Sequence, residues 1–147
     1  MFNDHATTKE TALAEMRPYL GASLSLATLQ TDREVRVVNV SVDHGKRLTR
    51  DLPLGNPTRE DITAGIWSQV DQAFAEPVNA DDDSMASYAP TQIMAEAFRR
   101  EGFDGVLYKS RLGPGCNLAL FDLDSAHVEE VVLCRATGVE HKFAGYP

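Results

Sequence analysis

The sequence lacks the motifs that identify a metal or nucleotide site directly. It has only two cysteines, Cys116 and Cys134, without metal-ligand spacing, and so few thiols are typical of a reducing compartment. It contains neither the phosphate-binding Gly-x-x-x-x-Gly-Lys pattern nor the dinucleotide-binding Gly-x-Gly-x-x-Gly pattern. We therefore expect no bound metal and no nucleotide loop of these two kinds.

Long apolar runs and positive charge are also scarce. No apolar run approaches the roughly 20 residues that span a membrane, and the N-terminus lacks the basic and then apolar pattern of a signal peptide. The sequence has 14 Lys and Arg residues and 22 Asp and Glu residues. The resulting formal net charge of -8 disfavours binding to a phosphate backbone. These features predict a cytoplasmic protein that binds neither nucleic acid nor membranes directly.

What remains is typical of one globular domain. A chain of 147 residues with 43% hydrophobic and 24% charged residues is long enough for a single core. Periodicity predicts three helices, at residues 7–17, 58–77 and 90–102, and five strands, at residues 22–29, 35–42, 106–108, 118–121 and 128–134. Strands neighbour each other in sequence and do not alternate strictly with helices, which favours an α+β fold.

Several local patterns sharpen this expectation. Thr7 with Glu10, and Thr58 with Asp61, have the spacing of residues that cap the start of a helix. The first two strands are separated by a short polar segment, so a hairpin between them is plausible. Apolar stripes predict the buried faces of the last two helices: Ile62, Ile66, Val70, Ala73 and Phe74, then Ile93, Met94, Ala97 and Phe98.

Two polar residues have positions that suit a functional site. Ser110 follows a short apolar strand and precedes the turn Gly113-Pro114-Gly115, so it can contact a ligand; equally, its hydroxyl can cap a plain hairpin turn. Glu15 lies beside the apolar face of the first helix, where a carboxylate is usually solvated. The residues alone leave both alternatives open.

Two separated blocks nevertheless resemble the RES-domain family. Residues 11–15 read TALAE and are followed by Arg17-Pro18, and this block resembles the TALAE segment of that family. A second block, in the same order as in the family, comprises Tyr88, Pro90-Thr91-Gln92, Glu96, Gly102-Phe103-Asp104-Gly105, Tyr108, Ser110, Gly115 and Asn117 to Phe121. The resemblance extends over residues 11–121.

The resemblance implies both a fold and a function. The fold would be α+β and ADP-ribosyltransferase-like, with a small mixed or antiparallel sheet flanked by helices. The protein would be the toxin of a toxin–antitoxin pair that degrades NAD+, by phosphorolysis or hydrolysis, with an Xre-type helix-turn-helix antitoxin as its partner. NAD+ and inorganic phosphate would be substrates, without a bound cofactor, and homo-oligomerisation stays open.

It also implies roles for particular residues. Glu15 and Ser110 match the family's glutamate and serine and would be catalytic, while Tyr88, Gln92 and Asn117 would bind substrate. Cleavage of the bond between nicotinamide and ribose leaves positive charge on the sugar, which a carboxylate such as Glu15 can stabilise. The hydroxyl of Ser110 can hydrogen-bond a ribose hydroxyl or a phosphate oxygen.

The N-terminal segment of the sequence differs from that of the family. The family's arginine lies in a strand upstream of the TALAE helix, whereas only ten residues precede Thr11 here, and none of them is arginine. We therefore expect a single domain over residues 1–147 that is truncated at its N-terminus relative to the family. Two hypotheses follow: an NAD+-degrading toxin, or an inactive or truncated RES-like module that binds an Xre-type antitoxin.

Overall fold

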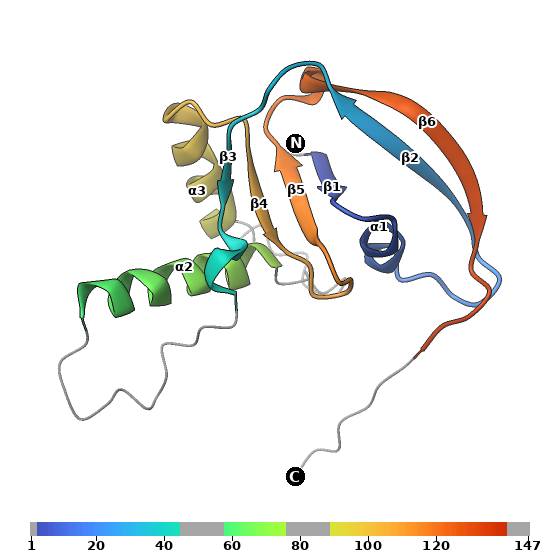
Figure 1. The fold of residues 1–147 in the computed structure, drawn as a ribbon, viewed down its shortest axis with the longest axis horizontal. Coiled ribbons are helices and arrows are strands. Elements are labelled where there is room, and N and C mark those ends of the chain that lie inside the picture. The colour runs from blue at the N-terminus through green and yellow to red at the C-terminus, as the bar shows by residue number, and fades with distance from the viewer. Residues whose placement is uncertain (1–2, 45–57, 76–88, 141–147) are drawn as a thin grey trace, which may run out of the picture.

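A computed structural model describes residues 3–44, 58–75 and 89–140 of the chain (Figure 1). Over these ranges the chain forms three α-helices, two 3-10 helices and six strands, which are arranged in a four-stranded and a two-stranded sheet. This confirms the expected α+β class. No helix in the described ranges is long and apolar enough to cross a bilayer.

The larger sheet is mixed and has the order β1-β5-β4-β3. Its strands are β1 (Asn3–Ala6), β3 (Val37–Asn39), β4 (Gly105–Lys109) and β5 (Cys116–Leu120). β3 runs parallel to β4, while β4 with β5 and β5 with β1 are antiparallel, as the prediction of a small mixed or antiparallel sheet requires. The short β3 leaves the last residues of β4 without a strand partner on that side.

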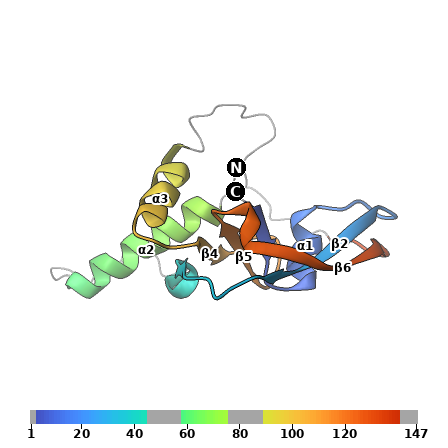
Figure 2. The ribbon, with the colours of Figure 1, turned by 90° about the horizontal axis from the view of Figure 1, so that it is seen from above.

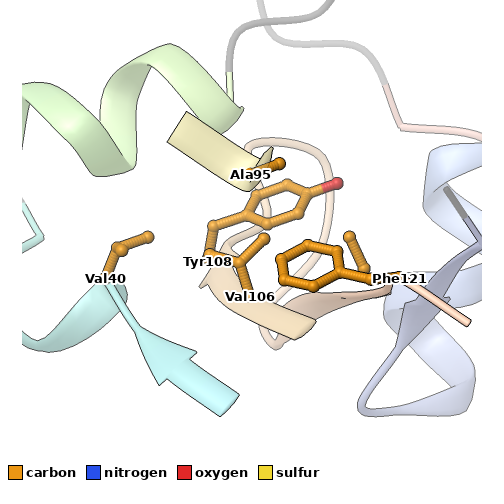
Figure 3. Packing of buried hydrophobic residues seen from close by; sticks show 6 residues of the cluster. Val40, Ala95, Val106, Tyr108 and Phe121 are labelled. Atoms are coloured by element: carbon orange, nitrogen blue, oxygen red, sulfur yellow. The ribbon is translucent and has the colours of Figure 1, made fainter. Parts of the chain in front are cut away.

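Helices pack near both edges of this sheet. α2 (Arg59–Ala75) and α3 (Ala89–Arg100) contact β4, and α1 (Lys9–Glu15) contacts β1. Figure 2 shows α2 and α3 gathered near β4, with α1 and the second sheet toward the other end. The core lies on the helical side of β4, where the side chains of Val40, Ala95, Val106, Tyr108 and Phe121 converge (Figure 3).

The second sheet is a curved ribbon of β2 (Ser23–Thr31) and β6 (Ala126–Arg135), which pair antiparallel with a register shift at Thr28/Leu29. The predicted hairpin between residues 22–29 and 35–42 is therefore wrong. β2 pairs with β6, about a hundred residues away, and β3 pairs with β4. The segment after β2 does not turn back, because Arg33 is held by Asp104 at the start of β4.

The helix starts agree with the sequence in one case and differ in the other. Thr58 donates its backbone N–H and its hydroxyl to Asp61, and Asp61 donates its N–H in return, as predicted. In α1 the cap is Thr8 and not Thr7: the hydroxyl of Thr8 accepts the N–H of Thr11 at 3.2 Å. Thr7 instead bonds Cys116 of β5, which joins the helix start to the sheet.

The predicted buried stripe of α2 is wrong in its first half. Ile62 and Ile66 are exposed, whereas Gly65, Ser68 and Asp71 are buried. Small side chains let this face approach the sheet, and the buried carboxylate is compensated by a backbone donor, described below. The apolar pattern alone could not show this, because it treats every carboxylate as a surface group.

α3 differs in a similar way. It ends as predicted before Gly102, whose φ of 81° is the left-handed conformation that glycine adopts without strain. Ala95 is its buried residue, and Ile93 of the predicted stripe is 70% exposed. Met94 and Phe98 are partly buried, so the contact face is rotated from the expected one.

A strand precedes α1, where the sequence analysis expected the arginine-bearing strand of the family to be missing. β1 pairs with β5 from Asn3 opposite Leu120 to Ala6 opposite Asn117. None of its four residues is an arginine. β1 nevertheless positions α1, because the helix follows it after only two residues.

A charged contact links the ribbon to the main sheet. Arg33 Nη2 donates to Oδ1 of Asp104 at 2.6 Å, and the backbone N–H of Arg36 donates to Oδ2 at 2.7 Å. The hydrogen bond from Arg33, together with the backbone donor and the charges of both arginines, lowers the pKa of Asp104 to about 2. The ionised carboxylate therefore stabilises the folded chain.

We predict that this contribution depends on pH. The folded pKa lies below the ordinary value of 3.8, so the stabilisation is complete above about pH 4 and is lost as the pH falls through about 2. Asp104→Asn should lower the free energy of unfolding by about 1 kcal/mol at pH 6, since Arg33 is exposed, and by almost nothing at pH 2. Urea titrations at both pH values test this, with exposed Glu129→Gln as the control; an equal loss at pH 2 and pH 6 would contradict it.

Candidate functional site

Three residues singled out by the sequence meet in one hydrogen-bonded cluster. Ser110 Oγ donates to Oε1 of Glu15 at 2.7 Å, and Asn117 Nδ2 donates to the same oxygen at 2.7 Å. Ser110 and Asn117 are buried, and Glu15 is half-buried. We call these residues the Glu15 cluster.

The topology explains why they meet. Ser110 directly follows β4, and Asn117 lies opposite Tyr108 near the start of β5, so the hairpin brings both to the same end of the sheet. Glu15 is the last residue of α1, one helical turn beyond Thr11. The helix thus delivers its carboxylate to the end of the β4–β5 hairpin.

The loop between the two strands, residues 110–115, is closed by its own hydrogen bonds. Ser110 Oγ accepts the backbone N–H groups of Leu112 and Gly113, at 3.1 and 2.8 Å. Its hydroxyl therefore donates once and accepts twice, which is the full capacity of a serine. Ser110 therefore caps the turn, as one of the two alternatives predicted, and the same hydroxyl also hydrogen-bonds Glu15.

Lys109 closes the loop from the strand side. Its ammonium donates to the carbonyl of Pro114 and, at 2.9 Å, to that of Gly115. Its backbone N–H lies beyond the end of the β3–β4 ladder and donates to Oδ1 of Asp71 at 2.9 Å. Asp71 is fully buried on α2, and its Oδ2 hydrogen-bonds Nδ1 of His44.

Sequence reasoning missed Asp71 and Lys109. Each lies in a predicted element or at its edge, but neither belongs to a motif that signals a contact with the loop. The only available signal for Asp71 was its place beside Val70 and Phe74, which are partly buried against the core. A carboxylate in that position needs a hydrogen-bond donor, and the backbone N–H of Lys109, which has no partner on β3, supplies one.

The fit of α1 against the loop depends on two glycines. A Cβ on Gly113 would lie 2.5 Å from Cα of Thr11, and a Cβ on Gly115 would lie 2.7 Å from its Oγ1. Thr11 is fully buried, and its Oγ1 accepts the N–H of Gly115 at 2.8 Å. This close approach sets the distance between the helix and the loop, and with it the distance between Glu15 and Ser110.

The other proposed substrate residues are not in this cluster. Gln92 is exposed on α3 and lines a separate hollow of about 450 Å³ with Ile93, Glu96, Ala97 and Arg100. α3 lies on the side of the sheet away from α1 (Figure 1), so Gln92 is not brought to Glu15. Tyr88 lies outside the described residues.

In the ranges that the structure covers, no three or more His, Cys, Asp or Glu side chains are grouped so that they could hold a metal ion. The hydrogen bonds that reach Glu15 come from donors of Ser110 and Asn117, which orient its carboxylate.

A groove of about 570 Å³ lies between α1 and the end of the ribbon. It is lined by Leu13, Ala14, Arg17, Pro18, Leu24, Leu112, Cys134, Arg135, Ala136, Gly138, Val139 and Glu140. Ala14 precedes Glu15 in the chain, and Leu112 donates its N–H to Ser110, so the groove begins next to the Glu15 cluster.

The comparison with known families agrees with the sequence motifs. A family model for the RES domain matches residues 5–139, which include every member of the Glu15 cluster. No curated protein and no solved structure shows significant similarity to the chain.

We predict that Gly113→Ala is strongly destabilising, because the added methyl group would meet backbone atoms of Thr11 that cannot move aside. The expected loss is about 2 kcal/mol or more in the free energy of unfolding, measured by urea denaturation. Gly138→Ala is the matched control, since nothing lies within 4 Å of its Cβ position. Equal stability of the two variants would contradict the close packing of α1 on the loop.

Proposed function

The chain belongs to the RES-domain family, and from this premise we propose that it degrades NAD+ by cleaving the bond between nicotinamide and ribose. The observation that carries the proposal is the Glu15 cluster: a half-buried carboxylate whose orientation is fixed by two donors at 2.7 Å. A fixed carboxylate is the group that such a cleavage requires beside the sugar.

The proposed reaction proceeds through positive charge on the ribose. As the C–N bond breaks, its electron pair leaves with nicotinamide and neutralises the charged ring, while the sugar carbon becomes electron-deficient. Glu15 stabilises that charge, and an oxygen of phosphate or water then attacks the carbon. Phosphate yields a phosphorylated ADP-ribose, and water yields ADP-ribose and releases a proton.

The hydrogen bonds divide the carboxylate into two ends. Both donors approach Oε1, and among the described residues no hydrogen bond reaches Oε2. Oε2 is therefore the oxygen that would face the sugar. Ser110 and Asn117 hold Oε1 before the substrate arrives, so little reorganisation is needed when the charge develops.

Loss of NAD+ would make the protein a toxin, and we propose a cytoplasmic Xre-type helix-turn-helix antitoxin as its partner. The second candidate function is that of an inactive module which binds such an antitoxin. An exposed apolar face on the ribbon favours a protein partner: Val131 and Leu133 lie near each other on β6 and are 60% and 78% exposed. Exposed apolar surface of this kind is typical of interaction sites.

We predict that the purified chain consumes NAD+ and that Glu15→Gln lowers kcat by at least about 100-fold, the range found when one charge-stabilising group is removed. The measurement is nicotinamide release, with and without inorganic phosphate; dependence on phosphate identifies phosphorolysis. Glu10→Gln, exposed in the first turn of the same helix, is the control. Undiminished NAD+ consumption by Glu15→Gln would contradict the proposed mechanism.

The partner proposal has a separate prediction. Leu133→Glu should weaken co-purification with an Xre-type helix-turn-helix protein by at least about tenfold, because it places a charge on the apolar face. It should leave NAD+ consumption unchanged, since Leu133 is not part of the Glu15 cluster. Co-purification that is unaffected by Leu133→Glu would exclude this face as the antitoxin site.

A further inference from the structure

The groove between α1 and the ribbon combines apolar walls with two cationic side chains. Leu13, Leu24, Leu112 and Val139 supply much of its apolar lining. Arg17, which follows the end of α1, and Arg135, the last residue of β6, both line the groove. A few polar groups in an apolar hollow of several hundred Å³ are characteristic of small-molecule sites.

Arg17 has an unfavourable backbone conformation. Its φ of 43° is in the left-handed region, and it is the only non-glycine residue in the described ranges with a positive φ. It directly follows the C-cap residue Met16, and its N–H donates to the carbonyl of Ala14 at 3.0 Å. Glycine is the usual residue at this position, so the backbone of Arg17 is strained, while its side chain lines the groove.

Arg135 lies near the same turn. Its Nη2 is 3.9 Å from the position that a Cβ on Gly21 would occupy, and Gly21 ends the segment that begins with Arg17. Within the part of the chain that the structure describes, neither arginine forms an ion pair. Among the lining residues that the structure describes, Glu140 is the one acidic residue beside two arginines, so this part of the groove has a positive balance in a chain with a net charge of -8.

We propose that this groove binds the adenosine diphosphate half of the dinucleotide, with the guanidinium groups of Arg17 and Arg135 on its phosphates. The ligand's identity rests on the proposed function, whereas the groove and its charges do not. Guanidinium groups bind phosphate oxygens through paired hydrogen bonds, and the apolar walls suit a purine ring. Since Ala14 and Leu112 line the groove beside Glu15 and Ser110, a dinucleotide lying in it directs its other half to the Glu15 cluster.

The test uses ADP, which the chain cannot cleave at a nicotinamide bond. Calorimetric titration of the full chain should show binding of ADP that is tighter than that of adenosine and that weakens with added salt. Arg17→Gly and Arg135→Ala should each weaken ADP binding roughly 10- to 100-fold, as expected for a charged hydrogen bond to phosphate. Arg100→Ala, an exposed arginine in the separate hollow on α3, should leave it unchanged.

Arg17→Gly provides a readout that a purely structural role would not give. Glycine relieves the left-handed strain, so the variant should melt at a higher temperature than the unaltered chain while it binds ADP less well. Opposite changes in stability and affinity would support the inference. Weaker ADP binding together with a lower melting temperature would overturn it, because loss of the fold would then account for both.

Failure of this inference is distinct from failure of the proposed function. Glu15-dependent NAD+ loss without measurable ADP binding, or with ADP binding that both arginine variants retain, overturns the groove assignment and leaves the reaction standing. The converse result is that the chain does not consume NAD+ but binds ADP, and that Arg17→Gly and Arg135→Ala weaken this binding. It would support the assignment of the groove and contradict the proposed reaction.

Discussion

The position of Glu15 depends on the contact of Thr11 with Gly113 and Gly115. α1 is not part of a sheet, so no ladder of backbone hydrogen bonds fixes it against the β4–β5 hairpin. Thr11 replaces that ladder: it is fully buried, accepts the N–H of Gly115, and occupies the space that a Cβ on either glycine would fill. A carboxylate one turn further along the helix is thereby held within hydrogen-bond reach of Ser110.

The same loop is supported from the opposite side by a buried carboxyl group. Asp71 on α2 accepts the last backbone N–H of β4, that of Lys109, where the short β3 no longer reaches, and His44 bonds its other oxygen. Burial of a carboxylate is costly unless its oxygens are paired, and here both are. Asp71 thus bonds Lys109, and the next residue, Ser110, bonds Glu15. Through this chain of contacts α2 helps to position Glu15 without contacting it.

Sequence patterns predicted the features that are local. β4 and β5, the glycine turn between them and the end of α3 at Gly102 follow from short-range periodicity and from glycine's tolerance of unusual φ. The pairing of β2 with β6 was missed because about a hundred residues separate the strands, and no local pattern specifies such a partner. The meeting of Glu15 with Ser110 was expected only from the family motifs, and Asp71 was missed because the burial of a carboxylate depends on a donor contributed by another element.

The Glu15 carboxylate and the two groove arginines differ in how they are paired. The Glu15 carboxylate is restrained on one oxygen by two buried donors, which suits a group that must stabilise charge at the instant a bond breaks. Arg17 and Arg135 lie at an open groove without acidic partners in the described ranges, which suits groups that exchange water for phosphate when a ligand arrives. A pre-paired arginine would have to break an ion pair before it could bind, whereas an unrestrained carboxylate would have to be ordered during the reaction. The rigid carboxylate and the unpaired cations are therefore each arranged in the way that their proposed step requires.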